Sequence, residues 1–288
     1  MLEYFDPKKE EGMTASIDMV RQTVRFKPKS LDDLLEVCDT AMTSEAPVHW
    51  ESNKPAGWRH LYALEFDEGK TAAVGLVFND PKGAPNEGRG FIEFNPNKLM
   101  GNPAFVNFYK RFVSRSDRIA LDRFDLAVDI PDRRNLFQLV KDRRKYEFHS
   151  SGALTEYLGR KNRPGRVKLY DKAAEGGLEY PLTRLEMTCD GSWTLDKVVE
   201  QLPTVLDLRK PSESFKDVPS IAMLISLGRL GVCVESFIAM YQSKRTQAKI
   251  RSAIATSNSA SIPTQIIADA LASCWARYGS SKILPSPA

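Results

Sequence analysis

Two tyrosines, Tyr157 and Tyr170, lie in the stretch "TEYLGRKNRPGRVKLYDK" (155–172), which is crowded with lysine and arginine. Between Lys141 and Lys172 there are ten lysine and arginine residues against four acidic ones, and this local net charge of +6 exceeds the +4 of the whole chain. Such a concentration is typical of a face that binds a polyanion, and also of a solvated charged surface. A tyrosine in this setting can stack on a nucleobase, pack in the core or attack a phosphate.

The third role requires help for the phenol, because a group with a pKa of about 10 is a poor nucleophile at neutral pH. Nearby cations or a metal favour the phenolate, and cations also neutralise the phosphate under attack. Tyr157 is followed by several candidates for this role: Arg160, Lys161, Arg163, Arg166 and Lys168. The combination fits attack on a DNA phosphodiester, which gives a phosphotyrosine link and a free 3′-hydroxyl.

Carboxylates in two further stretches could supply a metal site. In "RFDLAVDI" (123–130), strand alternation places Asp125 and Asp129 on one face, and in "LTRLEMTC" (182–189) it places Glu186 opposite the apolar residues. If the two strands are neighbours, Asp129 and Glu186 could share a hard cation, Mg²⁺ or Mn²⁺. The alternative is that these carboxylates are salt-bridge partners.

The surrounding elements repeat in order. Strands are expected at 15–26, 60–66, 71–79 and 89–96, and again at 121–130, 154–159, 166–172 and 182–189, with "RKNRPG" (160–165) as a hairpin turn. Helices are expected at 30–42, 132–145, 220–257 and 263–279. Each half therefore runs strand, helix, three strands, and Ile17-Asp18-Met19 occupies the place that Phe124-Asp125-Leu126 has in the second half.

This order predicts an α+β fold in which a duplicated strand-helix-strand-strand-strand unit forms one or more antiparallel sheets. We expect a leader at 1–14, a first unit at 15–110, a second unit with the reactive tyrosine at 118–210 and a helical C-terminal region at 211–288. That last region carries eight basic and four acidic residues. It could bind DNA, pair with a second subunit or cover the sheet.

Composition favours a cytoplasmic protein. Hydrophobic content is 42% and charged content 27% of the 288 residues. No stretch approaches the roughly 20 apolar residues of a membrane helix, and the N-terminus lacks the apolar segment of a secretory signal. The four cysteines have no zinc-like spacing and are expected to be buried or incidental thiols.

Taken in order and at their spacing, "RFDLAVDI", "YLGRKNRPGRVKLYDKAAE" and "LTRLEM" resemble the trans-acting plasmid rolling-circle replication initiators, which are related to replication initiation factors of filamentous phage. That family's pattern is approximately R-x-D-x-A-x-D, then Y-I-G-S-R-x-S and R-x-Y-D-K, then R-x-E. The resemblance covers about residues 15–190. It implies a fold related to the His-hydrophobic-His endonucleases, Tyr157 as the nicking tyrosine, and Asp129 and Glu186 as metal-site residues. We take Asp125 as a further metal-site candidate.

The chain departs from the pattern after the tyrosine, where it has Gly159-Arg160-Lys161-Asn162. The arginine that steadies the phosphate is therefore left open between Arg160, Arg163 and Arg166, and we take Arg160 and Arg166 as the catalytic candidates. Candidate DNA-binding residues are Lys161, Arg163, Lys168, Lys172 and Tyr170, with packing or substrate positioning expected for the last. The His-hydrophobic-His motif itself is absent, and His49, His60 and His149 stand apart in the sequence.

These observations predict a metal-dependent DNA nickase and strand transferase that starts and ends rolling-circle replication. The resemblance implies a homodimer acting on double-stranded plasmid origin DNA and its extruded single-stranded nick site, with a host helicase and DNA polymerase as partners and no membrane. One alternative is a non-catalytic DNA-binding regulator in which Tyr157 stacks on bases. Another is a tyrosine recombinase or topoisomerase, which needs no metal.

Overall fold

The computed structural model describes residues 12–41, 48–51, 60–67, 69–78, 87–149, 154–209, 219–230 and 232–279, so most of the expected leader lies outside the described residues. The strands are β1 (Thr14–Phe26), β2 (Val48–Glu51), β3 (His60–Asp67), β4 (Lys70–Val77), β5 (Gly88–Phe94), β6 (Arg118–Ile130), β7 (Phe137–Leu139), β8 (Tyr146–His149), β9 (Thr155–Leu158), β10 (Val167–Asp171), β11 (Thr183–Asp190) and β12 (Val205–Asp207). The α-helices are α1 (Leu31–Ala41), α2 (Pro96–Leu99), α3 (Pro103–Ser114), α4 (Lys172–Gly176), α5 (Leu195–Gln201), α6 (Pro219–Arg229), α7 (Val234–Ala239), α8 (Lys244–Asn258) and α9 (Thr264–Tyr278).

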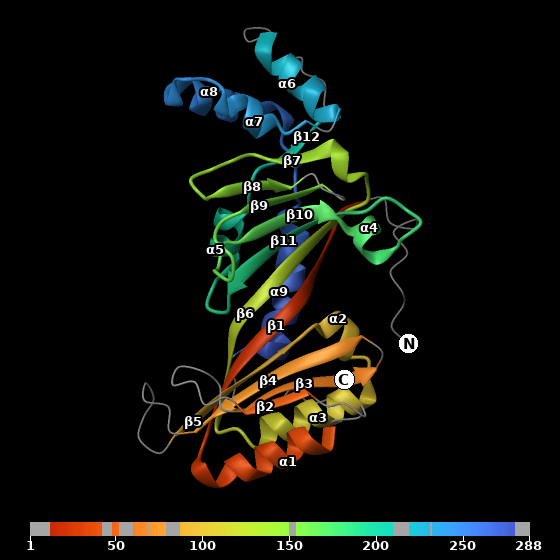
Figure 1. Cartoon of the computed structure of the whole chain (residues 1–288), viewed down its shortest axis with the longest axis vertical. Coiled ribbons are helices and arrows are strands. Elements are labelled where there is room, and N and C mark those ends of the chain that lie inside the picture. Colours follow the sequence, from red (N-terminus) through yellow and green to blue (C-terminus); the bar gives the residue numbers. More distant parts are fainter. Residues whose placement is uncertain are drawn as a thin grey trace.

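Ten of these strands form one antiparallel sheet in the order β2-β3-β4-β5-β1-β6-β11-β10-β9-β8. The long strands β1 and β6 pair at its centre and run through the middle of the molecule (Figure 1). The two sides of this pair have the same strand order. In the first half β1 lies beside β5, followed outward by β4, β3 and β2, and in the second half β6 lies beside β11, followed outward by β10, β9 and β8. The expected α+β fold with a large antiparallel sheet is confirmed.

An aromatic core joins α3 to the first half of the sheet. The side chain of Asn102 accepts hydrogen bonds from Ala104 N and Phe105 N and so caps the start of α3. The ring of Phe105 then lies 5.2 Å from Phe66 on β3 and 4.9 Å from Phe94 on β5, centroid to centroid. Helices α1 and α3 therefore cover one face of this half, as Figure 1 shows at the bottom of the view.

The C-terminal helices divide into two groups. Helix α9 packs on β1 and β6 through buried residues that include Ile267 and Leu271, and the carbonyl of Tyr278 accepts a hydrogen bond of 3.0 Å from Gln22 Nε2. Helices α6, α7 and α8 instead share a separate apolar cluster with the β12 segment, at the other end of the molecule from α1 (Figure 1). All four cysteines are buried and form no disulfide. Within the described part of the chain, no helix is both long enough and apolar enough to cross a membrane.

The helix predicted for 132–145 is wrong. This stretch forms a 3-10 turn at Arg134–Leu136, the short strand β7, and a loop that leads into β8, a strand the sequence interpretation missed. β7 pairs with β12, and the four residues 137–140 are all buried, as in a strand covered on both faces. The guanidinium of Arg134, which a helix would have exposed, is instead buried and donates to Glu156 on β9 at 2.6 Å.

Candidate functional site

One lateral row of side chains crosses four adjacent strands and contains Tyr157. Tyr157 on β9 is paired with Glu147 on β8 and with Lys168 on β10, and Lys168 is paired with Glu186 on β11. Directly paired residues of antiparallel strands project from the same face of the sheet. With strands about 4.8 Å apart, the backbones at Tyr157 and Glu186 are separated by about 10 Å, with Lys168 between them. The sheet thus brings the predicted tyrosine, a cation and a carboxylate onto one surface.

The ring of Tyr157 is half-buried between a cation and a histidine. The Arg166 guanidinium carbon lies 4.2 Å from the ring centroid, and the imidazole of His149 meets the ring edge-on, with centroids 5.7 Å apart. Arg166 also donates to the carbonyl of Gly159, and its Nη2 lies 3.6 Å from Glu147 Oε2. These contacts fix the ring on the sheet and hold a positive charge against its face.

Of the two arginines proposed as catalytic, Arg166 is the one in contact with Tyr157. Arg160 is exposed at the start of the hairpin turn and lines a separate hollow with Arg163. The structure therefore distinguishes the candidates by position, although the sequence spacing alone did not. His149 was given no role from the sequence, because it stands apart from the other histidines and belongs to no His-hydrophobic-His motif.

Glycine at position 159 lets the chain turn directly after the tyrosine-bearing strand. Its φ is +88°, in the region that favours glycine, and a Cβ at this position would lie 3.1 Å from the carbonyl oxygen of Gly165 and 3.3 Å from Arg166 Cα. The amide of Gly165 in turn donates to Thr188 O at 2.8 Å, which fastens the turn to β11. The backbone of the 165–166 segment therefore approaches closely at Gly159.

Substituting Gly159 by alanine is expected to lower the free energy of unfolding by about 1–3 kcal/mol, because alanine is strained at positive φ and its Cβ meets the opposite backbone. Urea denaturation measures this cost. The matched control is Gly177→Ala, where φ is +62° and no atom lies within 4 Å of the added Cβ. Equal destabilisation by the two variants would show that crowding at the hairpin has no part in the effect.

Tyr170 has a different environment from Tyr157. It is 3% exposed, and its hydroxyl donates to Glu186 Oε2 at 3.3 Å. The Nζ of Lys168 lies 3.6 Å from its ring centroid, and burial, followed by the charge of Glu186, raises the pKa of this phenol. A buried phenol with a raised pKa is less suited to attack, so its surroundings favour packing and positioning.

The predicted metal-site carboxylates fall into two groups. Asp129 forms a bidentate ion pair with Arg184, with Nε–Oδ1 at 2.7 Å and Nη2–Oδ2 at 2.8 Å, so both of its oxygens are engaged. Arg184 Nη1 also lies 3.2 Å from Oδ1 of Asp18, a β1 residue. Asp125 and Glu186 lie outside this pairing. Among the described residues, no group of three or more histidine, cysteine and acidic side chains has the arrangement of a metal site.

The ionised forms of Asp125 and Glu186 are disfavoured in their surroundings. Burial raises the pKa of Glu186, and the charges of Asp125 and Asp18 raise it further, whereas Lys168 opposes the shift. Burial likewise raises the pKa of Asp125, with a hydrogen bond from Thr188 acting in the opposite direction. Oδ1 of Asp125 is buried with no hydrogen-bond partner in the described structure. A cation at this point would relieve both carboxylates.

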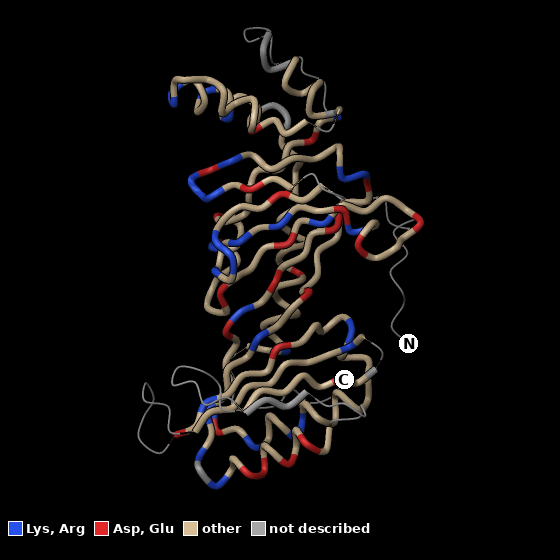
Figure 2. The backbone as a smooth tube through the Cα atoms, in the orientation of Figure 1, with Lys and Arg blue, Asp and Glu red and all other residues tan. Residues whose placement is uncertain are grey.

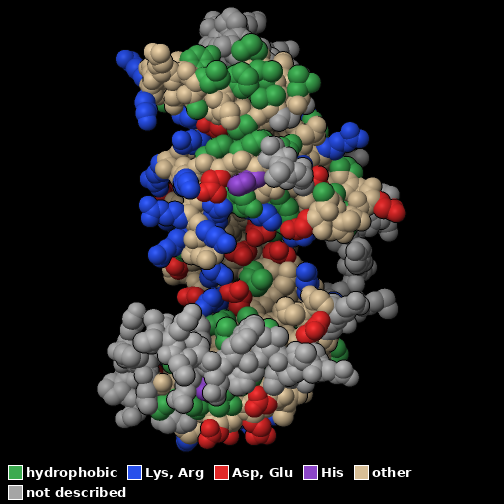
Figure 3. Space-filling view, in the orientation of Figure 1, with side chains coloured by type: hydrophobic (Ala, Val, Ile, Leu, Met, Phe, Trp, Pro, Cys, Tyr) green, Lys and Arg blue, Asp and Glu red, His purple; other side chains and the backbone are tan. Residues whose placement is uncertain are grey.

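Glu186 and Asp18 line a cleft of about 500 Å³ between the two halves of the sheet. Asn95 and Lys98 also line it from the first half, and Tyr170 from the second. Figure 3 shows acidic side chains gathered in the hollow in the middle of this face. Asp18 could have been found from the sequence, since its position in the first half matches that of Asp125 in the second.

The remaining predicted DNA-binding residues differ in their exposure and in their ion pairs. Lys161 and Arg163 are exposed in the hairpin turn. Lys168 and Lys172 lie 3.4 and 2.7 Å from the carboxylate of Glu175. Figure 2 shows that lysine and arginine concentrate in the β7–β8 and β9–β10 loops, on one side of the sheet.

Comparisons with known proteins leave the family open. No protein-family model matches the chain, and no curated protein matches it in sequence. Among solved structures, the rolling circle replication initiator protein from Geobacillus stearothermophilus aligns with a TM-score of 0.38 and 13% sequence identity, over 86% of this chain and 98% of that one. A match at this level assigns no activity, so function has to be argued from the site.

Proposed function

We propose that this chain is a replication initiator that nicks one DNA strand at an origin through a phosphotyrosine at Tyr157 and later reseals it. The observation that carries the proposal is the row containing Tyr157, Lys168 and Glu186, with the Arg166 guanidinium 4.2 Å from the tyrosine ring. The three motifs that resemble the rolling-circle initiators also occupy adjacent strands, β6, β11, β10 and β9.

In the proposed reaction, the phenolic oxygen of Tyr157 attacks the scissile phosphorus and the P–O3′ bond breaks. The 5′ phosphate becomes esterified to the tyrosine, the phenolic proton is released, and the departing oxygen takes up a proton to give a 3′-hydroxyl that primes synthesis. Attack by a 3′-hydroxyl on the phosphotyrosine reverses these steps and reseals the strand. Arg166, beside the ring, would stabilise the phenolate and the charge that develops on the phosphate.

A divalent cation fits part of the predicted ligand set. Glu186 and Asp125 would hold Mg²⁺ or Mn²⁺, since both are oxygen donors with raised pKa values and Asp125 Oδ1 has no hydrogen-bond partner among the described residues. Asp129 could join only if Arg184 released it. Such an ion supplies charge neutralisation at the phosphate.

Substituting Glu186 by glutamine is expected to have opposite effects with and without metal. Without metal, the raised carboxyl pKa values mean that the folded chain holds more protons than the unfolded one at mildly acidic pH, so stability rises as pH falls and the neutral amide raises Tm. With Mn²⁺, the wild type should gain Tm at neutral pH and less at mildly acidic pH, whereas the variant gains none. DNA cleavage should fall about 100-fold or more.

Thermal unfolding with and without Mn²⁺, at both pH values, measures the first effect, and a gel assay measures cleavage. The matched variant is Asp129→Asn, which should lose stability through Arg184 but retain the Mn²⁺ shift. The opposite pattern, with the shift lost in Asp129→Asn and kept in Glu186→Gln, would overturn this ligand assignment.

The proposal extends to partners and assembly. A homodimer, a host helicase and polymerase, and recognition of duplex origin DNA with an extruded nick site follow from the family resemblance. Helices α6, α7 and α8 are our candidate for part of the recognition surface. DNA binding without cleavage in any divalent metal would instead favour a regulator in which Tyr157 stacks on bases.

A further inference from the structure

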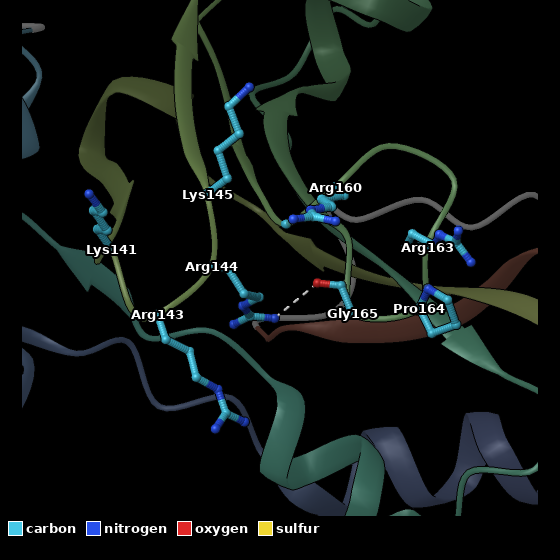
Figure 4. Close-up of a pocket in the computed structure, with 9 residues that line it drawn as sticks. Lys141, Arg143, Arg144, Lys145, Arg160, Arg163, Pro164 and Gly165 are labelled. Atoms are coloured by element: carbon cyan, nitrogen blue, oxygen red, sulfur yellow. Dashed lines mark hydrogen bonds between the residues drawn. The ribbon is translucent and has the colours of Figure 1, made fainter.

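A hollow of about 580 Å³ lies beside the tyrosine hairpin, between the 141–145 segment and the β9–β10 turn (Figure 4). We refer to it as the basic pocket, and its lining residues are Lys141, Arg143, Arg144, Lys145, Gly159, Arg160, Arg163, Pro164 and Gly165. Six of the nine are lysine or arginine and none is acidic. The pocket is therefore a candidate site for an anion that carries several charges.

Hydrogen bonds hold the two walls of the basic pocket together. The amide of Gly159 donates to Lys145 O at 2.8 Å, and Arg144 Nη1 donates to the carbonyls of Gly165 and Gln201 at 3.1 and 3.0 Å. Figure 4 shows the Arg144–Gly165 bond between the walls. Among the six cations, Arg144 is the one that joins the two walls through these side-chain hydrogen bonds. The shape of the pocket therefore does not depend on the exposed side chains at its rim.

Four of the other cations are exposed and form no ion pair with described residues: Lys141, Arg143, Arg160 and Arg163. In the view of Figure 4, Lys141 and Arg163 lie at opposite ends of the group, with Arg144 and Arg160 between them. Like charges around one hollow repel each other, and successive phosphates of a nucleic acid strand would relieve that repulsion.

The pocket is next to the proposed nucleophile. Gly159, which lines it, follows Tyr157 by two residues, and its carbonyl accepts a hydrogen bond from the Arg166 guanidinium that covers the Tyr157 ring. A strand whose phosphates lie in the pocket would thus pass Tyr157 within a few nucleotides.

We propose that the basic pocket binds backbone phosphates of the single strand that flanks the scissile phosphate, with the 141–145 segment as a second DNA-binding wall opposite the hairpin. This inference rests on the proposed function. A local hollow of this size accepts a flexible single strand, whereas the stiff cylinder of a duplex would rest on its rim. Contacts to phosphates carry no sequence information, so the pocket contributes affinity and strand path for any base sequence.

Fluorescence anisotropy with a labelled single-stranded oligothymidylate tests this, using the full chain with Tyr157→Phe and no divalent metal. Lys141→Ala combined with Arg143→Ala should weaken binding and reduce the slope of log K against log salt by about 1.4, since each lost phosphate contact contributes about 0.7 for single strands. The matched control removes two exposed cations elsewhere, Lys110→Ala with Arg118→Ala, and should leave the slope unchanged. Thermal unfolding checks that both variants are folded.

Binding of the same variants to a duplex and to thymidine monophosphate is then measured. These titrations show whether the pocket prefers the phosphates of a single strand, of a duplex or of a free nucleotide. A loss confined to the single strand supports the proposal. An unchanged single-strand slope, an equal loss for the duplex, or a loss seen only with the mononucleotide would each overturn it. Because the assay needs neither cleavage nor metal, it can fail while Tyr157 still forms an adduct with DNA, and it can succeed while no adduct forms.

Discussion

Replacing Tyr157 by phenylalanine is expected to abolish the covalent protein–DNA adduct while leaving the fold and DNA binding intact. The change removes only the hydroxyl, and the phenyl ring can keep its contacts with Arg166 and His149. Loss of the attacking atom should reduce cleavage to background, an effect of several orders of magnitude. Incubation with 3′-labelled single-stranded DNA and denaturing gel electrophoresis measures the adduct, because the labelled fragment stays on the tyrosine.

Tyr170→Phe is the matched control, since it removes the same atom from the neighbouring strand. The variant loses the hydrogen bond that the Tyr170 hydroxyl donates to Glu186 but keeps the proposed nucleophile Tyr157. Adduct formation should therefore persist at a reduced rate. If Tyr170→Phe abolished the adduct and Tyr157→Phe did not, the roles of the two tyrosines would be exchanged.

Replacing Arg134 by methionine is expected to destabilise the chain by about 3–5 kcal/mol, because it leaves a buried carboxylate without its charge partner. The side chains of Arg134 and Glu156 are 3% and 0% exposed, and Glu156 also accepts hydrogen bonds of 2.8 Å from Leu139 N and Tyr146 Oη. This network ties β9, which carries Tyr157, to β7 and β8. Urea denaturation measures the loss.

An exposed ion pair provides the comparison. Lys197 and Glu200 are 43% and 59% exposed and pair at 2.9 Å, so Lys197→Met should change stability by no more than about 1 kcal/mol. Similar losses for the two variants would mean that the buried network does not carry the stability assigned to it here.

Much of the second half could be predicted because its strands alternate cleanly. Leu185 and Met187 lie on the core face, with Arg184 and Glu186 opposite, as the alternation in "LTRLEMTC" implied. The hairpin followed from Pro164-Gly165 between two such runs. Period-two patterns of this kind specify both the element and the face that each side chain occupies.

The helix predicted at 132–145 failed for a physical reason. Its apolar residues are adjacent, a pattern that a short buried strand and a helical face share. Its polar residues were the decisive signal and were misleading, because Arg134 and Gln138 are buried and hydrogen-bonded rather than solvated. β8, which follows directly at Tyr146–His149, was a separate omission.

The composition of the site was predictable to the level of residue type, and pairing required the structure. Alternation placed Asp129 and Glu186 on one face, but only the strand register shows that Asp129 lies opposite Arg184 and is engaged by it. The same holds for the basic pocket, since the 141–145 segment meets the hairpin only through long-range hydrogen bonds.

The residue that becomes joined to DNA during cleavage identifies the nucleophile. The full chain is incubated with Mn²⁺ and a random-sequence library of single-stranded DNA, the denaturant-resistant adduct is enriched, and its peptides are mapped by mass spectrometry. We expect a nucleotide phosphate on the peptide that contains Tyr157. An adduct on Tyr170 or another residue, or persistent DNA binding without any adduct, would contradict it.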